Sequence, residues 1–179
     1  YSSNSKSIMT VRFDLYSTEK KLISIITRQN YDLKNMGIYV VSDNVETISK
    51  CLEQGVKIVQ LRDKNSETNE LLIKAKSIKK AITNHSSNAI FIVNDRPDIA
   101  RLVDADGVHI GQDDMTVEEA REIIGQNKIV GKSTHKIEQA RAAIKEGADY
   151  IGVGPIWETP TKAGKKSVGL EYLKQEVEE

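Results

Sequence analysis

Short apolar runs alternate with longer amphipathic stretches along most of this chain, and the alternation predicts its secondary structure. Short apolar runs bounded by turn residues are typical of buried strands, and apolar positions at helical spacing are typical of amphipathic helices. The predicted strands are residues 38–42, 56–61, 89–94, 107–110, 129–132 and 150–153. The predicted helices are residues 44–54, 67–84, 97–104, 116–124, 136–146 and 169–178. Because strands that alternate with helices form βαβ units, the strands are expected to be parallel.

Internal similarity favours a barrel over other parallel α/β folds. Residues 105–111 (ADGVHIG) resemble residues 148–154 (ADYIGVG), as repeated βα units would. Gly55 and Gly147 each separate a helix from a strand, where a left-handed helix cap fits. The chain has neither G-x-G-x-x-G nor a P-loop sequence, which argues against a nucleotide-binding doubly wound sheet. The expected fold class is α/β, a (βα)8 TIM barrel with only about six βα units in this chain; an open sheet is the alternative.

The first 37 residues do not show this alternation of short apolar runs with amphipathic stretches. Residues 1–10 are rich in serine and read as a linker, whereas residues 13–28 carry leucine and isoleucine at helical spacing. Two domains are therefore expected: an N-terminal extension over residues 1–37, the helical remnant of a longer region, and an incomplete TIM-barrel domain over residues 38–179. Since the chain begins with Tyr1 and not with Met, it is expected to be cut from a longer protein.

Composition narrows the partners and the compartment. The 26 basic and 26 acidic residues give a formal net charge of zero, so nothing indicates a nucleic-acid partner. No apolar run approaches the roughly 20 residues that span a bilayer, and no signal peptide opens the chain. No membrane partner is therefore expected, and a cytoplasmic location is. Cys51, the single cysteine, cannot form an internal disulfide and is expected to be a buried structural thiol.

Polar residues gather at the predicted strand ends, where the loops of a βα barrel converge on the active site. After the second strand, Gln60 and Arg62 share one face because side chains alternate along a strand, and Lys64 extends that face. Arginine and lysine in this arrangement suit phosphate oxygens. A surface ion pair with Asp63 is the alternative.

Two carboxylates at the mouths of neighbouring strands suggest a metal. Asp95 follows the third strand and Asp114 the fourth. Carboxylates without a cysteine or histidine pair suit Mg²⁺ better than Zn²⁺, with substrate phosphate oxygens completing the ligand set. The alternatives are helix-capping roles, as N-cap for Asp95 and as favourable helix-dipole charge for Asp113 beside Asp114.

The last two predicted strands end in hydroxyl-bearing residues. Ser133 and His135 follow the fifth strand, and for His135 a helix-capping or supporting role competes with a catalytic one. The sixth strand leads into a long loop that carries Thr159, Thr161 and Lys162. A long loop on this face is a candidate lid or anion cradle, with a plain surface excursion as the alternative.

Five segments in order resemble the thiamine-phosphate synthase family, across residues 38–170. They are Gln60-Leu61-Arg62-x-Lys64, Asn94-Asp95-Arg96, His109-Ile110-Gly111-Gln112-x-Asp114, Gly131-x-Ser133-Thr134-His135 and Gly154-Pro155-x-x-x-Thr159-Pro160-Thr161-Lys162. Each segment alone is a modest signal, but five in this order are specific.

The resemblance implies a Mg²⁺-dependent transferase with two substrates. Such an enzyme joins hydroxymethylpyrimidine diphosphate to thiazole phosphate, or to its carboxylated form, and gives thiamine phosphate and diphosphate. Carried over by motif, the residues expected to bind the pyrimidine diphosphate are Gln60, Leu61, Arg62, Asp63, Lys64, Asn94, Ser133 and Lys162. Those expected to bind the thiazole phosphate are Thr159, Pro160 and Thr161, and those expected to bind Mg²⁺ are Asp95 and Asp114. The residues expected to act in catalysis are Arg62, Lys64, Lys162 and Ser133.

The resemblance leaves several alternatives open. The last two strands of the family's barrel are absent from this sequence, so activity of the chain as given is an open question. A thiazole tautomerase relative shares the barrel without coupling a diphosphate, and a non-catalytic ligand-binding fragment is a third reading. A homodimer is one assembly that this sequence allows.

Overall fold

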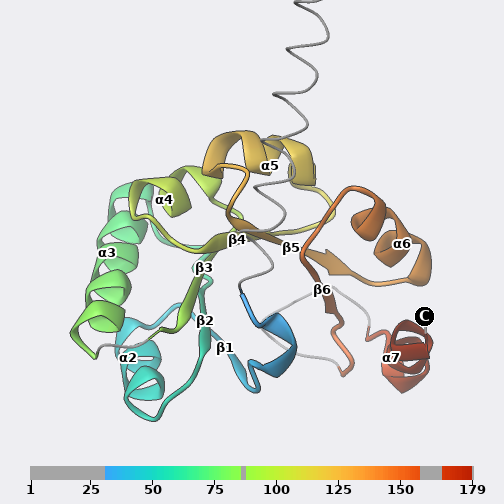
Figure 1. Ribbon diagram of the computed structural model, residues 1–179, viewed down its shortest axis with the longest axis horizontal. Helices are drawn as coiled ribbons and strands as arrows, with labels where there is room; N and C mark the ends of the chain where they lie inside the picture. Colours follow the sequence, from blue (N-terminus) through green and yellow to red (C-terminus); the bar gives the residue numbers. More distant parts are fainter. Residues whose placement is uncertain (1–30, 86–87, 158–166, 179) are drawn as a thin grey trace, which may run out of the picture. The chain divides into compact units, whose positions relative to one another are not determined.

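The computed structural model describes residues 31–85, 88–157 and 167–178 (Figure 1). The chain divides into two compact units, residues 1–32 and 33–179, and the second is described below. Its strands are β1 (Tyr39–Ser42), β2 (Ile58–Leu61), β3 (Ile90–Asn94), β4 (Gly107–Ile110), β5 (Ile129–Thr134) and β6 (Tyr150–Val153). Its helices are η1 (Leu33–Asn35), α2 (Val45–Glu53), α3 (Thr68–Asn84), α4 (Pro97–Leu102), α5 (Val117–Ile124), α6 (Ile137–Lys145) and α7 (Gly169–Glu178). The helix expected over residues 13–28 lies outside the described residues.

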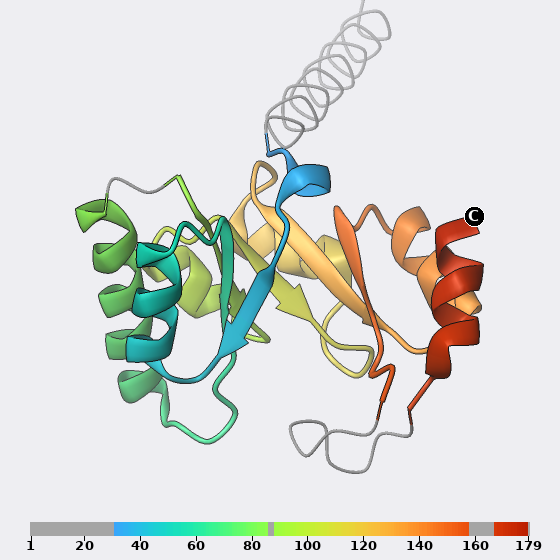
Figure 2. The ribbon, with the colours of Figure 1, turned by 90° about the horizontal axis from the view of Figure 1, so that it is seen from below.

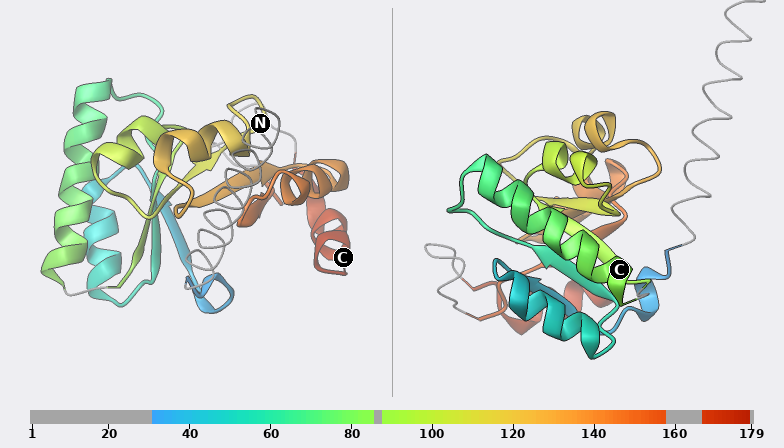
Figure 3. Two further views of the ribbon diagram at one scale, coloured as in Figure 1. Left: turned by 45° about the horizontal axis from the view of Figure 1, so that its top comes forward. Right: turned by 90° about the vertical axis from the view of Figure 1, so that its left-hand side faces the viewer.

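The six strands form one parallel sheet in the order β1-β2-β3-β4-β5-β6. The sheet curves into a half-barrel with the helices outside it (Figure 1). Figure 2 shows α2 and α3 on one flank and α6 and α7 on the other, and in Figure 3 the long α3 lies across the outer side of the strands. The predicted α/β fold of six parallel βα units is confirmed. Three elements differ from the predicted bounds by two residues: β2 begins at Ile58, α4 ends at Leu102, and β5 runs on to Thr134.

Because side chains alternate along each strand, the sheet has an apolar outer face and an inner face that changes from apolar to polar along the strands. Outward-facing residues such as Val59, Leu61 and Phe91 are fully buried in the core between the sheet and the helices. On the inner face, Ile58 at the start of β2 and Ile92 in the middle of β3 are nearly inaccessible. Two positions further along the same strands, this face carries polar side chains. The inner face therefore has an apolar part deeper in the half-barrel, called the apolar floor below, and a polar part toward the carboxyl ends of the strands, called the polar rim.

The helix boundaries have local causes. Asn44 caps α2 by accepting a hydrogen bond of 2.9 Å from the backbone N–H of Thr47, and Thr116 forms a capping box with Glu119 at the start of α5. Gly55 and Gly147 follow α2 and α6 with φ of +82° and +84°, as the predicted left-handed caps require. Cys51 lies on α2 and is only partly buried, so the expectation of a buried thiol is wrong in degree.

A buried arginine joins α5 to the two strands that follow it. The Arg121 side chain is 6% exposed and donates to the backbone oxygens of Lys128 and Gly147 at 2.6 and 2.8 Å. It also pairs with Asp149 at 2.7 Å, and that carboxylate accepts a further bond of 2.8 Å from the N–H of Val130. The guanidinium thus satisfies polar groups of the two connections that lead into β5 and β6.

Arg121→Ala should destabilise the fold by about 3 kcal/mol, because it removes the buried guanidinium that pairs with Asp149 and donates to two carbonyls. Urea unfolding followed by circular dichroism measures the change. Lys50→Ala is the control, since Lys50 pairs with Glu46 on an exposed helix face and should change the free energy of unfolding by no more than about 0.5 kcal/mol. Equal effects of the two substitutions would contradict the role given to Arg121.

Candidate active site

A cavity of about 600 Å³ lies at the carboxyl ends of the strands and is lined by side chains from all six. Parallel strands deliver their last inward-facing residues to one edge, which is where ligands of βα barrels bind. The structure brings together here seven residues singled out from the sequence: Gln60, Arg62, Lys64, Asn94, Asp95, Asp114 and Ser133.

Two of the predicted residues next to them do not face the cavity. Leu61 is fully buried in the outer core. The Asp63 side chain is 4% exposed and accepts bonds of 2.6 Å from Lys74 and 2.7 Å from Ser66. The Lys74 bond, with those from Ser66 and the backbone, holds the pKa of Asp63 well below its usual range against the opposing effect of burial. Strand alternation and this turn network direct both side chains away from the cavity. Leu61 contributes to the core and Asp63 stabilises the turn between β2 and α3, and the substrate-binding roles expected for them stay predictions.

The predicted loop residues Thr159, Pro160, Thr161 and Lys162 lie outside the described residues. The two ends of that loop are joined by a backbone bond of 2.8 Å from the N–H of Val168 to the oxygen of Pro155. The roles expected for the four residues stay predictions.

Asp95 and Asp114 meet at the cavity rim, as expected from their strand ends. Asp95 adopts φ +59°, a left-handed conformation that Asp tolerates better than most residues. The N-cap position of α4 belongs to Arg96, so the capping alternative for Asp95 is not realised. Lys64 Nζ lies 3.0 Å from Asp95 Oδ2, and Asp114 Oδ2 accepts a bond of 2.6 Å from the N–H of Gly111.

The electrostatics of this rim suit a divalent cation. Burial, which Lys64 opposes and the nearby Asp114 carboxylate reinforces, raises the pKa of Asp95. The described lining of the cavity carries three carboxylates, Asp95, Asp113 and Asp114, against the two cations Arg62 and Lys64. No cluster of three or more potential metal ligands occurs among the described residues. Two adjacent carboxylates nevertheless fit Mg²⁺, which commonly takes one or two of them and completes its shell with phosphate oxygens and water.

Side chains from five strands form a hydrogen-bonded chain across the interior. Gln60 Nε2 donates to Tyr39 Oη at 2.7 Å, and the hydroxyls of Tyr39 and Tyr150 lie 2.8 Å apart. Tyr150 Oη lies 3.0 Å from His109 Nδ1, and His109 Nε2 lies 2.9 Å from Ser133 Oγ. Sequence reasoning did not assign Tyr39, His109 or Tyr150 to the site. The sequence nevertheless held one signal for them: each of the three residues carries a polar group at an inward-facing position of an otherwise apolar strand.

Gly131 makes this chain of contacts sterically feasible. It pairs in register with His109 on β4 and with Tyr150 on β6. A Cβ at position 131 would collide with the Tyr150 ring. Because the middle strand has no side chain at this level, the rings of His109 and Tyr150 reach each other over it, with centroids 5.5 Å apart.

Two further polar residues brace the end of β5. Gln112 donates its side-chain amide to the backbone oxygen of Ser133. His135 donates from Nδ1 to the backbone oxygen of Gly154, and its own N–H donates to Gln139 on α6. Both line the cavity. The contacts of His135 agree with the supporting role that competed with a catalytic one.

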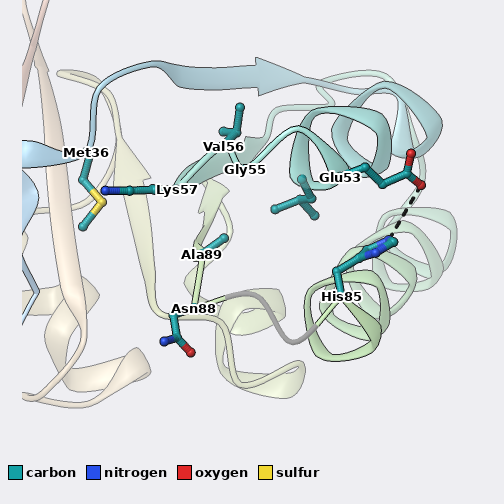
Figure 4. A pocket seen from close by; sticks show the side chains of 9 residues that line it. Met36, Glu53, Gly55, Val56, Lys57, His85, Asn88 and Ala89 are labelled. Atoms are coloured by element: carbon teal, nitrogen blue, oxygen red, sulfur yellow. Dashed lines mark ion pairs between the residues drawn. The ribbon is translucent and has the colours of Figure 1, made fainter.

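A second cavity, of about 490 Å³, lies at the amino ends of the strands (Figure 4). Met36 and Lys57 lie on one side of it, and His85 faces Glu53 on the other with 3.8 Å between Nε2 and Oε1. His85 is exposed. In a βα barrel this end typically serves stability rather than catalysis.

The curved parallel sheet and the polar cavity at its carboxyl ends define a protein of the βα-barrel class. Residues 34–179 match the family described as thiamine monophosphate synthase, and the chain belongs to this family. It is 43% identical over 171 residues to thiamine-phosphate synthase of Synechocystis sp., covering 93% of this chain and 49% of that protein. It is 46% identical over 149 residues to thiamine-phosphate synthase of Methanosarcina mazei, covering 78% of this chain and 61% of that protein.

A solved structure supports the same assignment. Thiamine phosphate pyrophosphorylase from Pyrococcus furiosus superposes with a TM-score of 0.70 and 39% identity, over 80% of this chain and 70% of that one. The chain spans about half the length of the curated cyanobacterial relatives that it matches. No described helix is long and apolar enough to cross a membrane.

Gly131→Ala should destabilise the protein by about 1–3 kcal/mol, because the added methyl group overpacks against the Tyr150 ring. The double variant Gly131→Ala/Tyr150→Ala is the control. Relative to Tyr150→Ala alone, the glycine substitution should there be neutral or slightly stabilising, since alanine restricts the unfolded chain more than glycine does. Thermal unfolding of the four proteins gives the coupling. A similar loss in both backgrounds would refute the steric explanation.

Proposed function

We propose that this chain forms most of the active site of a thiamine-phosphate synthase. The observation that carries the proposal is the grouping of Arg62 and Lys64 with the adjacent carboxylates Asp95 and Asp114 in one cavity. Two cations and a carboxylate pair suited to Mg²⁺ meet the needs of a diphosphate, whose negative charge grows as it leaves. Membership of the family supports the same choice.

The proposed substrates are hydroxymethylpyrimidine diphosphate and thiazole phosphate, or its carboxylated form. Arg62 presents a planar fork to diphosphate oxygens, and Lys64 a mobile charge at the cavity rim. Gln60 and Asn94, which are 3% and 9% exposed, are placed to orient the pyrimidine. Ser133 and Lys162 complete the diphosphate site in this proposal, and Thr159, Pro160 and Thr161 hold the thiazole phosphate.

The reaction needs no protein nucleophile. The bond from the pyrimidine methylene carbon to the diphosphate oxygen breaks, both electrons leave with the diphosphate, and the aminopyrimidine ring stabilises the resulting cation. The thiazole nitrogen then donates its electron pair to that carbon and forms the new C–N bond. When bound at Asp95 and Asp114, Mg²⁺ supplies positive charge to the diphosphate oxygens. Arg62 and Lys64 act by holding the leaving group in line and by neutralising it.

Two other functions remain candidates. A thiazole tautomerase relative would use a similar barrel, but it has no need for the cations beside a carboxylate pair. A ligand-binding fragment would bind the pyrimidine diphosphate without turnover. A cytoplasmic location and a homodimer stay predictions.

Asp95→Asn should abolish stabilisation by Mg²⁺. Wild-type chain with MgCl₂ at a hundredfold excess over the dissociation constant should gain about 2.7 kcal/mol, and the variant should gain little. Thermal midpoints in EDTA and in MgCl₂ measure this response. Asp98→Asn is the matched control, because Asp98 pairs with Arg96 and does not line the cavity. If Mg²⁺ stabilised Asp95→Asn as much as wild type, the proposal that Asp95 binds Mg²⁺ would be rejected.

The same variant tests the direction of the Asp95 pKa. Because that pKa is raised in the folded state, the contribution of Asp95 to stability is full below about pH 4, its unfolded pKa, and declines as the pH rises through the folded value. Without divalent cations, Asp95→Asn should therefore gain stability relative to wild type between pH 4 and pH 7. A relative loss over that interval would show that the Lys64 contact dominates.

Arg62→Ala should lower the rate of thiamine phosphate formation at least a hundredfold, in line with the loss of one preorganised donor to developing charge. Product and diphosphate are quantified after mixing both substrates with MgCl₂. Arg101→Ala is the control, since Arg101 is exposed on α4 and bonds to the oxygen of Ile123. Calorimetry with the pyrimidine diphosphate separates the alternatives: binding without turnover by wild type identifies a ligand-binding fragment, and near-normal turnover by Arg62→Ala rejects the site.

A further inference from the structure

Tyr39, Tyr150 and His109 have no role in the reaction proposed above, yet they connect two residues that do. They lie between Gln60 on β2 and Ser133 on β5, joined by four contacts of 2.7 to 3.0 Å. Tyrosine hydroxyls and neutral imidazole each donate one hydrogen and accept another. Because each group donates to one neighbour and accepts from the other, all hydrogen bonds in the chain run in one direction. The donor or acceptor role of the residue at one end therefore determines whether the residue at the other end offers a hydrogen or a lone pair.

The direction follows from Gln60. Its Nε2 only donates, so Tyr39 Oη accepts at 2.7 Å and turns its own hydrogen toward Tyr150. Tyr150 then donates to His109 Nδ1. A ring nitrogen that accepts carries no hydrogen, so the hydrogen of neutral His109 sits on Nε2 and points to Ser133 Oγ at 2.9 Å.

Both tyrosines are available as donors at neutral pH. Burial raises the pKa of Tyr39 to about 12. Burial, reinforced by Tyr39, raises the pKa of the Tyr150 hydroxyl well above its ordinary value. Because neither hydroxyl ionises near neutrality, the chain of donors stays intact.

We propose that Tyr39 and Tyr150 are positioning residues that hold His109 in its Nε2–H tautomer and thereby present the Ser133 hydroxyl as a hydrogen-bond donor to an anionic ligand. Ser133 Oγ receives the His109 hydrogen, and its own hydrogen is then directed to the cavity. A phosphate oxygen can only accept, so this polarity suits a phosphorylated ligand. The ligand half of this inference rests on the proposed function, whereas the tautomer does not.

The opposite direction makes a different prediction. With the Gln60 amide rotated by half a turn, Tyr39 would donate to its oxygen, His109 would carry its hydrogen on Nδ1, and Ser133 would donate to His109. Ser133 would then offer only lone pairs to a phosphate, which repel it. The tautomer of His109 therefore distinguishes the two directions.

Nitrogen-15 NMR of the chain labelled at histidine measures the tautomer directly. The chain has three histidines, and the signals of His109 are identified by their loss in His109→Gln. We expect the Nε2–H tautomer in wild type near pH 7.5, and a shift toward a mixture in Tyr150→Phe, which removes the donor to Nδ1 but keeps the ring. An Nδ1–H tautomer or an imidazolium in wild type would overturn the proposal, as would an unchanged tautomer in Tyr150→Phe.

Tyr172→Phe is the matched control, because its hydroxyl is also buried but bonds to Thr134 at 2.9 Å. It should leave the His109 signals unchanged. Tyr39→Phe acts one step further from the histidine and serves as a second variant if Tyr150→Phe does not fold. It should weaken the same tautomer preference to a smaller extent.

Calorimetry with inorganic diphosphate and MgCl₂ tests the ligand half. Tyr150→Phe should weaken binding roughly fivefold, the effect of one hydrogen bond, and should have no further effect in a Ser133→Ala background. Independent, multiplicative effects of the two substitutions would overturn the coupling. If wild type binds no diphosphate, the ligand half fails together with the proposed function, while the NMR result still decides the positioning of His109.

Discussion

The absence of a side chain at Gly131 is the constraint on which the polar interior of this half-barrel depends. Position 131 lies between His109 and Tyr150 in the register of β4, β5 and β6, and any Cβ there would occupy the place of the tyrosine ring. With that space open, Tyr150 reaches both His109 and Tyr39 of the first strand. The first and last strands of the sheet, which do not pair, are therefore linked through their side chains.

The apolar floor and the polar rim divide the inner face into parts with different tasks. The isoleucines of the apolar floor exclude water, which strengthens the hydrogen bonds above them. At the rim, burial raises the pKa of Asp95, an effect that Lys64 opposes and Asp114 reinforces. The described lining carries both carboxylates and cations, which makes the cavity suited to a cation and an anion together. A chain of zero net charge thus concentrates its electrostatic specificity in a few residues at the strand ends.

Family membership and local geometry both support the proposal that the cavity binds a phosphorylated substrate, but the match covers only part of the relatives. The chain covers about half of the length of its cyanobacterial relatives, and six strands leave β1 and β6 as open edges. Val41 on β1 is 49% exposed although it lines the cavity. The described part of the cavity nevertheless contains the two cations, the carboxylate pair and the hydrogen-bonded chain on which both proposals rest.

The sequence by itself determined the six βα units, the glycine caps, and the placement of Gln60, Arg62, Lys64, Asp95 and Asp114 at the strand ends, because apolar periodicity and strand alternation are local properties. Only the tertiary structure showed that Lys74 reaches back to bind Asp63 and that Arg96, not Asp95, occupies the N-cap position of α4. It also decided the meeting of Tyr39 with Tyr150, residues far apart in the chain. The meeting of the two tyrosines depends on the curvature of the whole sheet and on the space left at Gly131, and neither is encoded in the pattern of any single strand.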